Sequence, residues 1–357
     1  MVTTVDITHT QTLKQGFEML PRATSFLRDF YFPTNEASDV FNTDDVLIDY
    51  KDGDKTLAPL VKKGGKSSNR DWHKTERFTP ARIAPKRTLT LDDLKRRGFG
   101  EAISSGLAPA DREAALALRD LQDLDKMITR REELICASLL MNSQVTLKHF
   151  ANGDSSTAEE EVTLKFFEGE TNPNSYAPAK LWGESGADIL ADLYAMGQQL
   201  IQKGRVASDL ILGDVAAAVF LGDAKIRELL DTNNLRIGAL EPKTLPNGVI
   251  SIGRISANGV SLNVYNYCEK YVDDKGVAQS YIPGKAAIIT AEGVGRTLYG
   301  AVTQVEQSDK QFHTYAGRRV PKYVSDVNED ERTLTLAACP LPAPNYLNGW
   351  VSATVIA

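Results

Sequence analysis

The longest helical pattern in the chain runs from Ala110 to Asn142, a stretch of 33 residues without glycine or proline. At about 1.5 Å per residue, this helix would be roughly 50 Å long. A compact domain of about 150 residues is narrower than that, so we predict an elongated molecule built around the helix. The apolar residues recur every three or four positions, as on one helical face, at Ala114, Ala117, Leu121, Leu124, Ile128, Ile135 and Leu139.

The residues around this stripe favour an ordinary buried helix. Arg131 interrupts the stripe, which hardly exceeds three heptads, so core packing is favoured over a coiled-coil seam. Pro109 suits the first position of a helix, and Asp111 and Glu113 place negative charge at the positive end of the helix dipole. The helix should therefore begin here.

The composition is that of an ordinary folded protein, with 42% hydrophobic and 25% charged residues among 357. The net charge of -6 gives no reason to expect a nucleic-acid or membrane partner. We find no signal-peptide core and no run of 18 apolar residues, so we expect a cytoplasmic protein without a membrane span. Three scattered cysteines should be reduced and buried, since they form neither a disulfide framework nor a zinc motif: Cys136, Cys268 and Cys339.

Sequence motifs for enzymatic chemistry are missing. The four histidines match no metal-ligand spacing, and the sequence contains neither a phosphate loop nor a Gly-x-Ser-x-Gly elbow. Gly293 and Gly295 form an incomplete dinucleotide fingerprint because Gly300 is misplaced, so we interpret them as a turn. We therefore predict no catalytic residue, no metal site and no cofactor. An enzyme of unrecognised class stays open as the alternative of a different kind.

A basic segment follows a strand predicted at Val46–Tyr50. Residues 51–87 hold eleven Lys and Arg against four Asp and Glu, a local charge of +7 that leaves -13 on the rest of the chain. A loop of this length is usually functional or disordered, and its glycine pair suits the tip of a long hairpin. Its mixture of cations and aromatics could contact nucleic acid, but we favour the acidic surface of identical neighbours. The candidate contact residues are Lys62, Lys63, Gly64, Gly65, Lys66, Arg70, Trp72 and Arg77.

The second candidate contact is the aromatic cluster FLRDFYF at residues 26–32. A patch of this size must be buried. Two interpretations stay open: a short amphipathic helix packed into its own core, or an arm that packs on a neighbouring subunit. The candidate residues are Phe26, Phe30 and Phe32.

The rest of the chain mixes helices and strands. Asn258-Gly259 separates two alternating apolar runs and is a strong hairpin signal. Helices are expected at about Gly186–Lys203, closed by Gly204, and at Asp214–Leu230. Further strands are expected at residues 162–167, 208–212, 286–290, 332–338 and 350–356.

The order of these parts resembles the lambda-like (protein E) family of tailed-bacteriophage major capsid proteins, over about Phe26 to Ala357. The resemblance implies an α+β, HK97-like phage capsid fold with an N-terminal arm, an extended loop, a long spine helix, and peripheral and axial domains. The motifs that carry it are FLRDFYF, RFTPARIAPKR, LRDLQDLDKMITRREELICASLL, IPGKAAIITAEGVGRTLYGAV and PLPAPNYLNGWVSATVIA.

The resemblance also implies a domain map and a function. The protein would form hexamers and pentamers of an icosahedral head that encloses double-stranded DNA, contacted non-specifically, with a decoration protein, a scaffold and a portal as partners. It would be assembled in the host cytoplasm and belong to the virion, whereas an encapsulin-type bacterial compartment is the alternative within the same fold class. The implied segments are 1–45 for the arm, 46–97 for the extended loop, 98–170 and 320–357 for the peripheral domain, and 171–319 for the axial domain.

Overall fold

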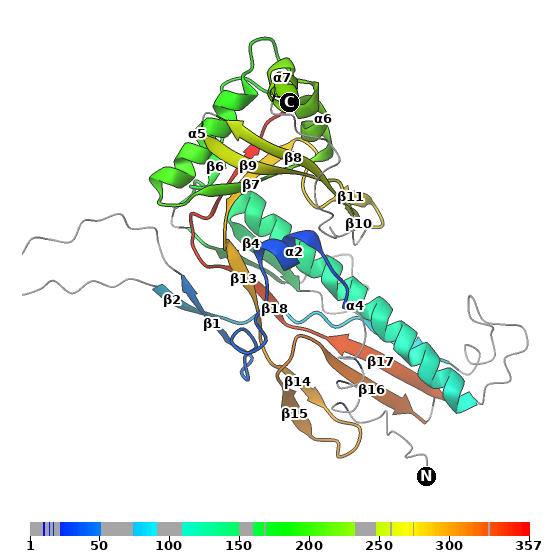
Figure 1. Cartoon of the computed structure of the whole chain (residues 1–357). Coiled ribbons are helices and arrows are strands. Elements are labelled where there is room, and N and C mark those ends of the chain that lie inside the picture. Colours follow the sequence, from blue (N-terminus) through cyan, green and yellow to red (C-terminus); the bar gives the residue numbers. More distant parts are fainter. Residues whose placement is uncertain are drawn as a thin grey trace, which may run out of the picture.

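The chain folds into an α/β unit and an elongated unit built on one long helix (Figure 1). The computed structural model describes residues 10, 14, 17, 22–50, 74–90, 109–149, 160–167, 169–232, 248–257, 259–273, 275–327 and 329–357. None of the helices in this part of the chain is long and apolar enough to cross a membrane.

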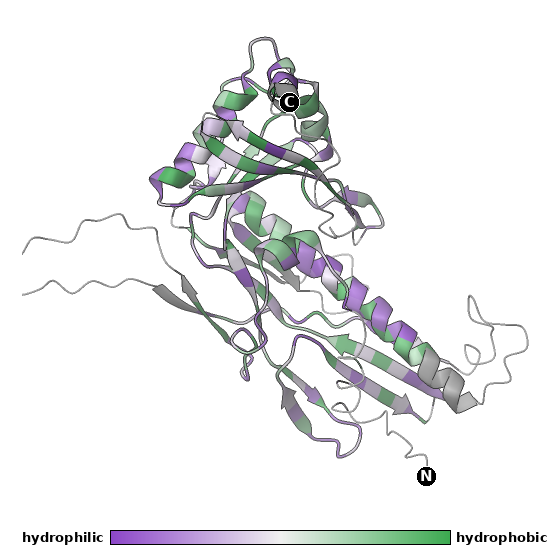
Figure 2. Ribbon diagram, viewed as in Figure 1, coloured by the Kyte–Doolittle hydropathy of each residue, from purple (hydrophilic) through white to green (hydrophobic). Residues whose placement is uncertain are grey.

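The long helix is α4, Pro109–Asn142, and it confirms the sequence prediction to within one residue. Its side chains Leu121, Leu124 and Ile128 are buried against one group of strands, and Ile135 and Leu139 enter the largest hydrophobic core. Figure 1 shows α4 running from the α/β unit along the length of the lower unit. In Figure 2 its hydrophobic and hydrophilic residues alternate along the helix, as expected of an element with one buried face.

Short antiparallel sheets surround α4 in the lower unit. A three-stranded sheet has the order β16-β17-β3, and three further pairs flank it. The strands are β3 (Lys86–Leu89), β16 (Val320–Asp326) and β17 (Glu331–Ala337), then the pairs β13 (Gly295–Tyr299) with β18 (Pro340–Pro344), β14 (Val302–Val305) with β15 (Phe312–Tyr315), and β4 (Gln144–His149) with β5 (Glu160–Lys165).

A six-stranded mixed sheet with the order β6-β19-β12-β7-β9-β8 forms the α/β unit. Side chains alternate between its faces, so Ile288 joins the core shared with α4 while Ile289 packs with the α5 side. The strands are β6 (Ser175–Tyr176), β7 (Ala207–Leu212), β8 (Val249–Ala257), β9 (Val260–Tyr267), β12 (Ala286–Ala291) and β19 (Trp350–Thr354); the helices are α5 (Ile189–Gln202), α6 (Asp214–Gly222) and α7 (Ala224–Thr232), and β10 (Lys270–Val272) pairs with β11 (Ala278–Ser280).

Local predictions in this unit were mostly confirmed. The antiparallel hairpin β8–β9 turns at Gly259, whose φ of 93° lies in the left-handed region that glycine tolerates. The prediction of a single helix at Asp214–Leu230 was wrong, because this stretch contains two helices, α6 and α7, separated at Asp223. Asp223 has an extended backbone, and its carboxylate accepts a hydrogen bond from the Ile226 N–H at 3.0 Å, which caps the second helix.

Strand pairing crosses the predicted segment boundaries in three places. Strand β19 pairs with β12 and β6, so the end of the 320–357 segment belongs to the sheet that was assigned to 171–319. Conversely, β13, β14 and β15 lie within residues 171–319 but do not belong to that sheet, because they form strand pairs in the lower unit. The loop assigned to 46–97 is also shorter, since β3 pairs with β17 and Ile83 bridges Ala338.

Candidate subunit-contact site and its buried support

The root of the predicted extended loop is a two-stranded ladder. Strand β1 (Val46–Tyr50) pairs antiparallel with β2 (Lys74–Phe78), and Val46 lies opposite Phe78. Val46 and Ile48 are fully buried while Leu47 is 50% exposed, so one face of β1 anchors the ladder in the core. In Figure 1, β1 and β2 point away from α4.

Arg77 is the one loop candidate that the structure describes. Its guanidinium pairs with Asp45, with Nε at 2.8 Å from Oδ2, and its side chain is 71% exposed. Hydrogen bonds from Thr79 and Arg77 lower the pKa of Asp45. Arg77 therefore links β2 to Asp45, directly before β1, and its side chain is still exposed to solvent. The other loop candidates lie outside the described residues: Lys62, Lys63, Gly64, Gly65, Lys66, Arg70 and Trp72.

The aromatic cluster forms a short helix in the subunit's own core. Helix α2 spans Phe26–Tyr31, and both Phe26 and Phe32 are fully buried. The Phe26 ring lies 5.4 Å from the ring of Tyr267 on β9. Of the two interpretations, the structure therefore supports the short helix packed into its own core for Phe26 and Phe32, because no surface of either side chain is left for a neighbour. Phe30 keeps 41% of its surface exposed and stays a candidate.

A buried cluster of charges, which we call the Glu132 cluster, links α2, α4 and the start of β16. Its members are Arg28, Asp125, Thr129, Glu132, Tyr299 and Arg319. The Glu132 carboxylate accepts hydrogen bonds from Arg319 at 2.7 and 2.9 Å, from Arg28 at 2.8 Å and from the Tyr299 hydroxyl at 2.9 Å. Arg319 Nε also donates to Asp125 at 2.7 Å. The cluster therefore connects α4 with α2, β13 and the start of β16, all of which are far from α4 in sequence.

Electrostatics keep Glu132 ionised. Burial raises the pKa of this carboxyl, but the charges and hydrogen bonds of Arg319 and Arg28 outweigh burial and lower the pKa to about 2. Since the Glu132 side chain is only 1% exposed, hydrogen bonds from these arginines replace those that water would otherwise donate to it.

The neighbouring Glu133 has a different role. Its carboxylate accepts the backbone N–H groups of Leu27 at 2.7 Å and Arg28 at 2.9 Å, which lie in the first turn of α2. The Tyr267 hydroxyl donates to it at 2.8 Å. Burial outweighs these hydrogen bonds and raises the pKa of Glu133, because a buried carboxylate loses its contact with water. Glu133 thus fixes α2 against both α4 and the α/β unit.

These buried acids were missed in the sequence, although a signal is visible there. The apolar stripe of α4 has a gap between Ile128 and Ile135, which we attributed to Arg131. Arg131 is exposed, and Glu132 is the residue that faces inward in the gap. An interrupted stripe on a long core helix can thus mark a buried polar cluster.

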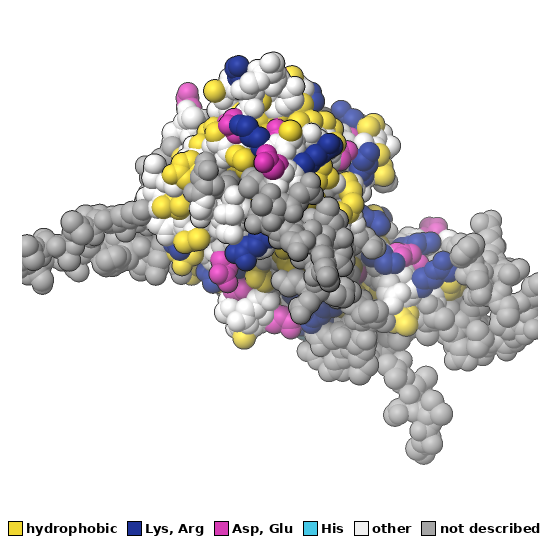
Figure 3. Space-filling model, turned by 45° about the horizontal axis from the view of Figure 1, so that its top comes forward, with side chains coloured by type: hydrophobic (Ala, Val, Ile, Leu, Met, Phe, Trp, Pro, Cys, Tyr) yellow, Lys and Arg dark blue, Asp and Glu magenta, His cyan; other side chains and the backbone are white. Residues whose placement is uncertain are grey.

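Several apolar side chains are exposed at the surface of the described residues. Phe312 on β15 is 77% exposed, and Val272 and Val277 beside the β10–β11 pair are 68% and 55% exposed. Figure 3 shows hydrophobic side chains interspersed with Lys, Arg, Asp and Glu over the displayed face of the α/β unit. Apolar side chains interspersed with charged ones are the ordinary composition of a protein surface.

Comparison with known proteins identifies relatives over almost the whole chain. The family model for phage major capsid protein E matches residues 9–355. No curated protein matches the sequence.

Solved structures with the same fold include a protein assigned as the capsid protein of a prophage from E. coli CFT073, with a TM-score of 0.70 and 18% identity over 98% of this chain and 99% of that one. A phage-related protein from Bordetella bronchiseptica RB50 has a TM-score of 0.52 and 9% identity, covering 96% and 95% of the two chains. At these identities the likeness concerns the fold alone, and it confirms the α+β, HK97-like phage capsid fold.

Proposed function

Because the chain belongs to the phage major capsid protein E family and is a capsid shell protein of the virion, we propose that it forms the hexamers and pentamers of an icosahedral head around double-stranded DNA. Shell contacts would be noncovalent, and the protein would have no enzymatic activity. The encapsulin-type compartment is less well supported, because the matching family model is that of a phage capsid protein.

The observation that carries the assembly proposal is the β1–β2 ladder. Its inner face is anchored by Val46 and Ile48, while Leu47 and Arg77 are exposed on a hairpin root that leads away from the core. We infer that residues 46–78, the revised extended loop, reach over a neighbouring subunit. Residues 51–87 carry +7 and the rest of the chain -13, so a loop on a neighbour would meet a complementary charge.

The same proposal covers the remaining partners. Packaged DNA would be contacted non-specifically, through its phosphate backbone. A scaffold, a portal and a decoration protein are the further partners we propose, with assembly in the host cytoplasm.

Replacing Lys62, Lys63 and Lys66 together by Glu tests the role of the loop. We expect loss of shells in electron micrographs while the subunit keeps its thermal unfolding midpoint, because a projecting loop contributes little to its own core. A matched control replaces three exposed lysines elsewhere by Glu and adds the same negative charge: Lys126, Lys270 and Lys275. Normal shells from the loop variant, or equal loss from the control, would contradict the proposed loop contact.

A further inference from the structure

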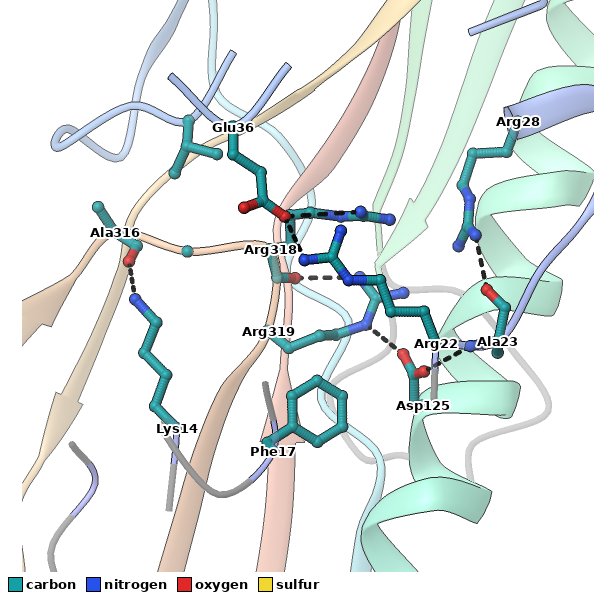
Figure 4. Close-up of a pocket in the computed structure, with 12 residues that line it drawn as sticks. Lys14, Phe17, Arg22, Ala23, Arg28, Glu36, Asp125, Ala316, Arg318 and Arg319 are labelled. Carbon is teal, nitrogen blue, oxygen red and sulfur yellow. Dashed lines mark hydrogen bonds and ion pairs between the residues drawn. The ribbon is translucent and has the colours of Figure 1, made fainter. Parts of the chain in front are cut away.

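A pocket of about 240 Å³ lies beside the Glu132 cluster, between the N-terminal segment, α4 and the turn before β16. Five cationic side chains and two carboxylates line it. In Figure 4 the Glu36 carboxylate lies between Arg22 and Arg318. The charged side chains of its lining include Lys14, Arg22, Glu36, Asp125, Arg318 and Arg319.

On the inner wall of the pocket two arginines face three carboxylates, which leaves no free positive charge there. Arg319 and Arg28 are held by Glu132, by Asp125 and by Asp29. The outer part holds Lys14, Arg22 and Arg318 against the single carboxylate of Glu36. Among the described residues, this outer part therefore carries two net positive charges.

Arg318 is the least satisfied of these cations. Its side chain is only 19% exposed, and its guanidinium lies over the Tyr299 ring, 5.7 Å from the ring centroid, but within the described residues it donates no hydrogen bond. Its ion pair with Glu36 is 3.9 Å long, and the same oxygen, Oε1, lies 2.8 Å from Nη2 of Arg22. A mostly buried guanidinium has five N–H donors that need acceptors, and a long ion pair to a shared oxygen does not supply them.

We propose that this pocket binds a phosphate group, with Arg318 and Arg22 as the ligands of its oxygens and Lys14 as a third cation. A phosphate with two negative charges matches the charge of the outer part, whereas a single carboxylate would leave an excess. Guanidinium groups fit phosphate oxygens two at a time, which gives the unused donors of Arg318 their acceptors. The volume is sufficient for one tetrahedral oxyanion with waters.

Glu36 acts as the competitor in this site. Its carboxylate shares Oε1 between the two arginines and is itself 54% exposed, so it can rotate towards solvent when phosphate enters. Replacing it with Gln removes the competing charge and should tighten phosphate binding. This inference does not depend on how the shell assembles.

Calorimetric titration of the unassembled subunit with inorganic phosphate, at constant ionic strength set by sodium chloride, tests the site. We expect Arg318→Gln to weaken binding by at least roughly tenfold, since it removes charge-assisted hydrogen bonds, and Glu36→Gln to strengthen it. The exposed Arg22→Gln repeats the loss without any risk to the core. Arg254→Gln, an exposed arginine on β8, is the control and should bind as the wild type does.

A second arm measures binding of a DNA duplex of about 20 base pairs by fluorescence anisotropy and separates the sources of the phosphate. If free phosphate saturates the wild type and Arg318→Gln weakens it, the source is a free anion. If only duplex binding falls in Arg318→Gln, the source is the DNA backbone, and the site stands. The proposal is overturned if neither ligand distinguishes Arg318→Gln from Arg254→Gln.

Discussion

Replacing Glu132 by Gln should destabilise the unassembled subunit by about 3 to 5 kcal/mol, the usual cost of removing one partner from a buried ion pair. Gln has nearly the shape of Glu but no charge. The substitution therefore leaves Arg28 and Arg319 buried without the carboxylate that binds both. Its amide would also point an N–H group at one of these donors or at the Tyr299 hydroxyl.

The pKa of Glu132 gives a similar magnitude independently. A decrease from 4.5 to about 2 corresponds to about 3 kcal/mol of preference for the charged over the neutral carboxyl. Because the folded pKa lies below the unfolded one, this stabilisation is present above about pH 4.5 and is lost as the pH falls towards 2. Glu132→Gln should therefore lose stability less steeply than the wild type over this interval.

Urea unfolding followed by circular dichroism at pH 7 and along this acid series measures both effects. Glu170→Gln is the control, because Glu170 is exposed and the substitution should change the free energy of unfolding by less than about 0.5 kcal/mol. A Glu132→Gln variant within about 1 kcal/mol of the wild type at pH 7 would refute the reasoning that the carboxylate holds the two arginines.

Three further outcomes are expected. Glu133→Gln should lower the free energy of unfolding less than Glu132→Gln does at pH 7 in the same urea assay, because burial raises the pKa of Glu133 and already disfavours its charge. An equal or larger decrease would contradict this reasoning. Gly213→Ala should destabilise by about 1–3 kcal/mol, since its Cβ would lie 2.3 Å from the Pro283 carbonyl oxygen, while the unhindered Gly222→Ala should not. Boiled particles should give a single 39.1 kDa band in SDS electrophoresis, and a ladder of multimers would reveal covalent links.

The sequence predicted best those elements whose pattern is local. Helix α4 has no glycine or proline over 33 residues and an apolar stripe along most of its length, and the β8–β9 hairpin has a turn that few dipeptides other than Asn-Gly favour. The sequence analysis missed the break at Asp223 because apolar residues continue from α6 into α7. In the structure the break is marked by the Asp223 carboxylate, which caps α7.

The buried cluster could not be assembled from sequence, because its partners are distant. Glu132 is separated from Arg28 by 104 positions and from Arg319 by 187. A single sequence assigns charged residues to solvent by default, and only tertiary packing reveals that the Glu132 carboxylate pairs with both arginines. The same limitation left both interpretations of Phe26 and Phe32 open, since a core and an interface require the same aromatic residues.

The position of β19 inside the six-stranded sheet delays completion of this sheet until the end of the chain has been synthesised. Residues 286–291 of β12 leave the ribosome about 60 positions before Trp350, so at roughly 5–20 residues per second their partner strand follows about 3–12 s later. During that interval β12 offers an unpaired edge, which could join the wrong chain. A subunit becomes complete only when residues 350–354 fill the gap between β6 and β12, and translation itself thus delays the moment at which a subunit can join its neighbours.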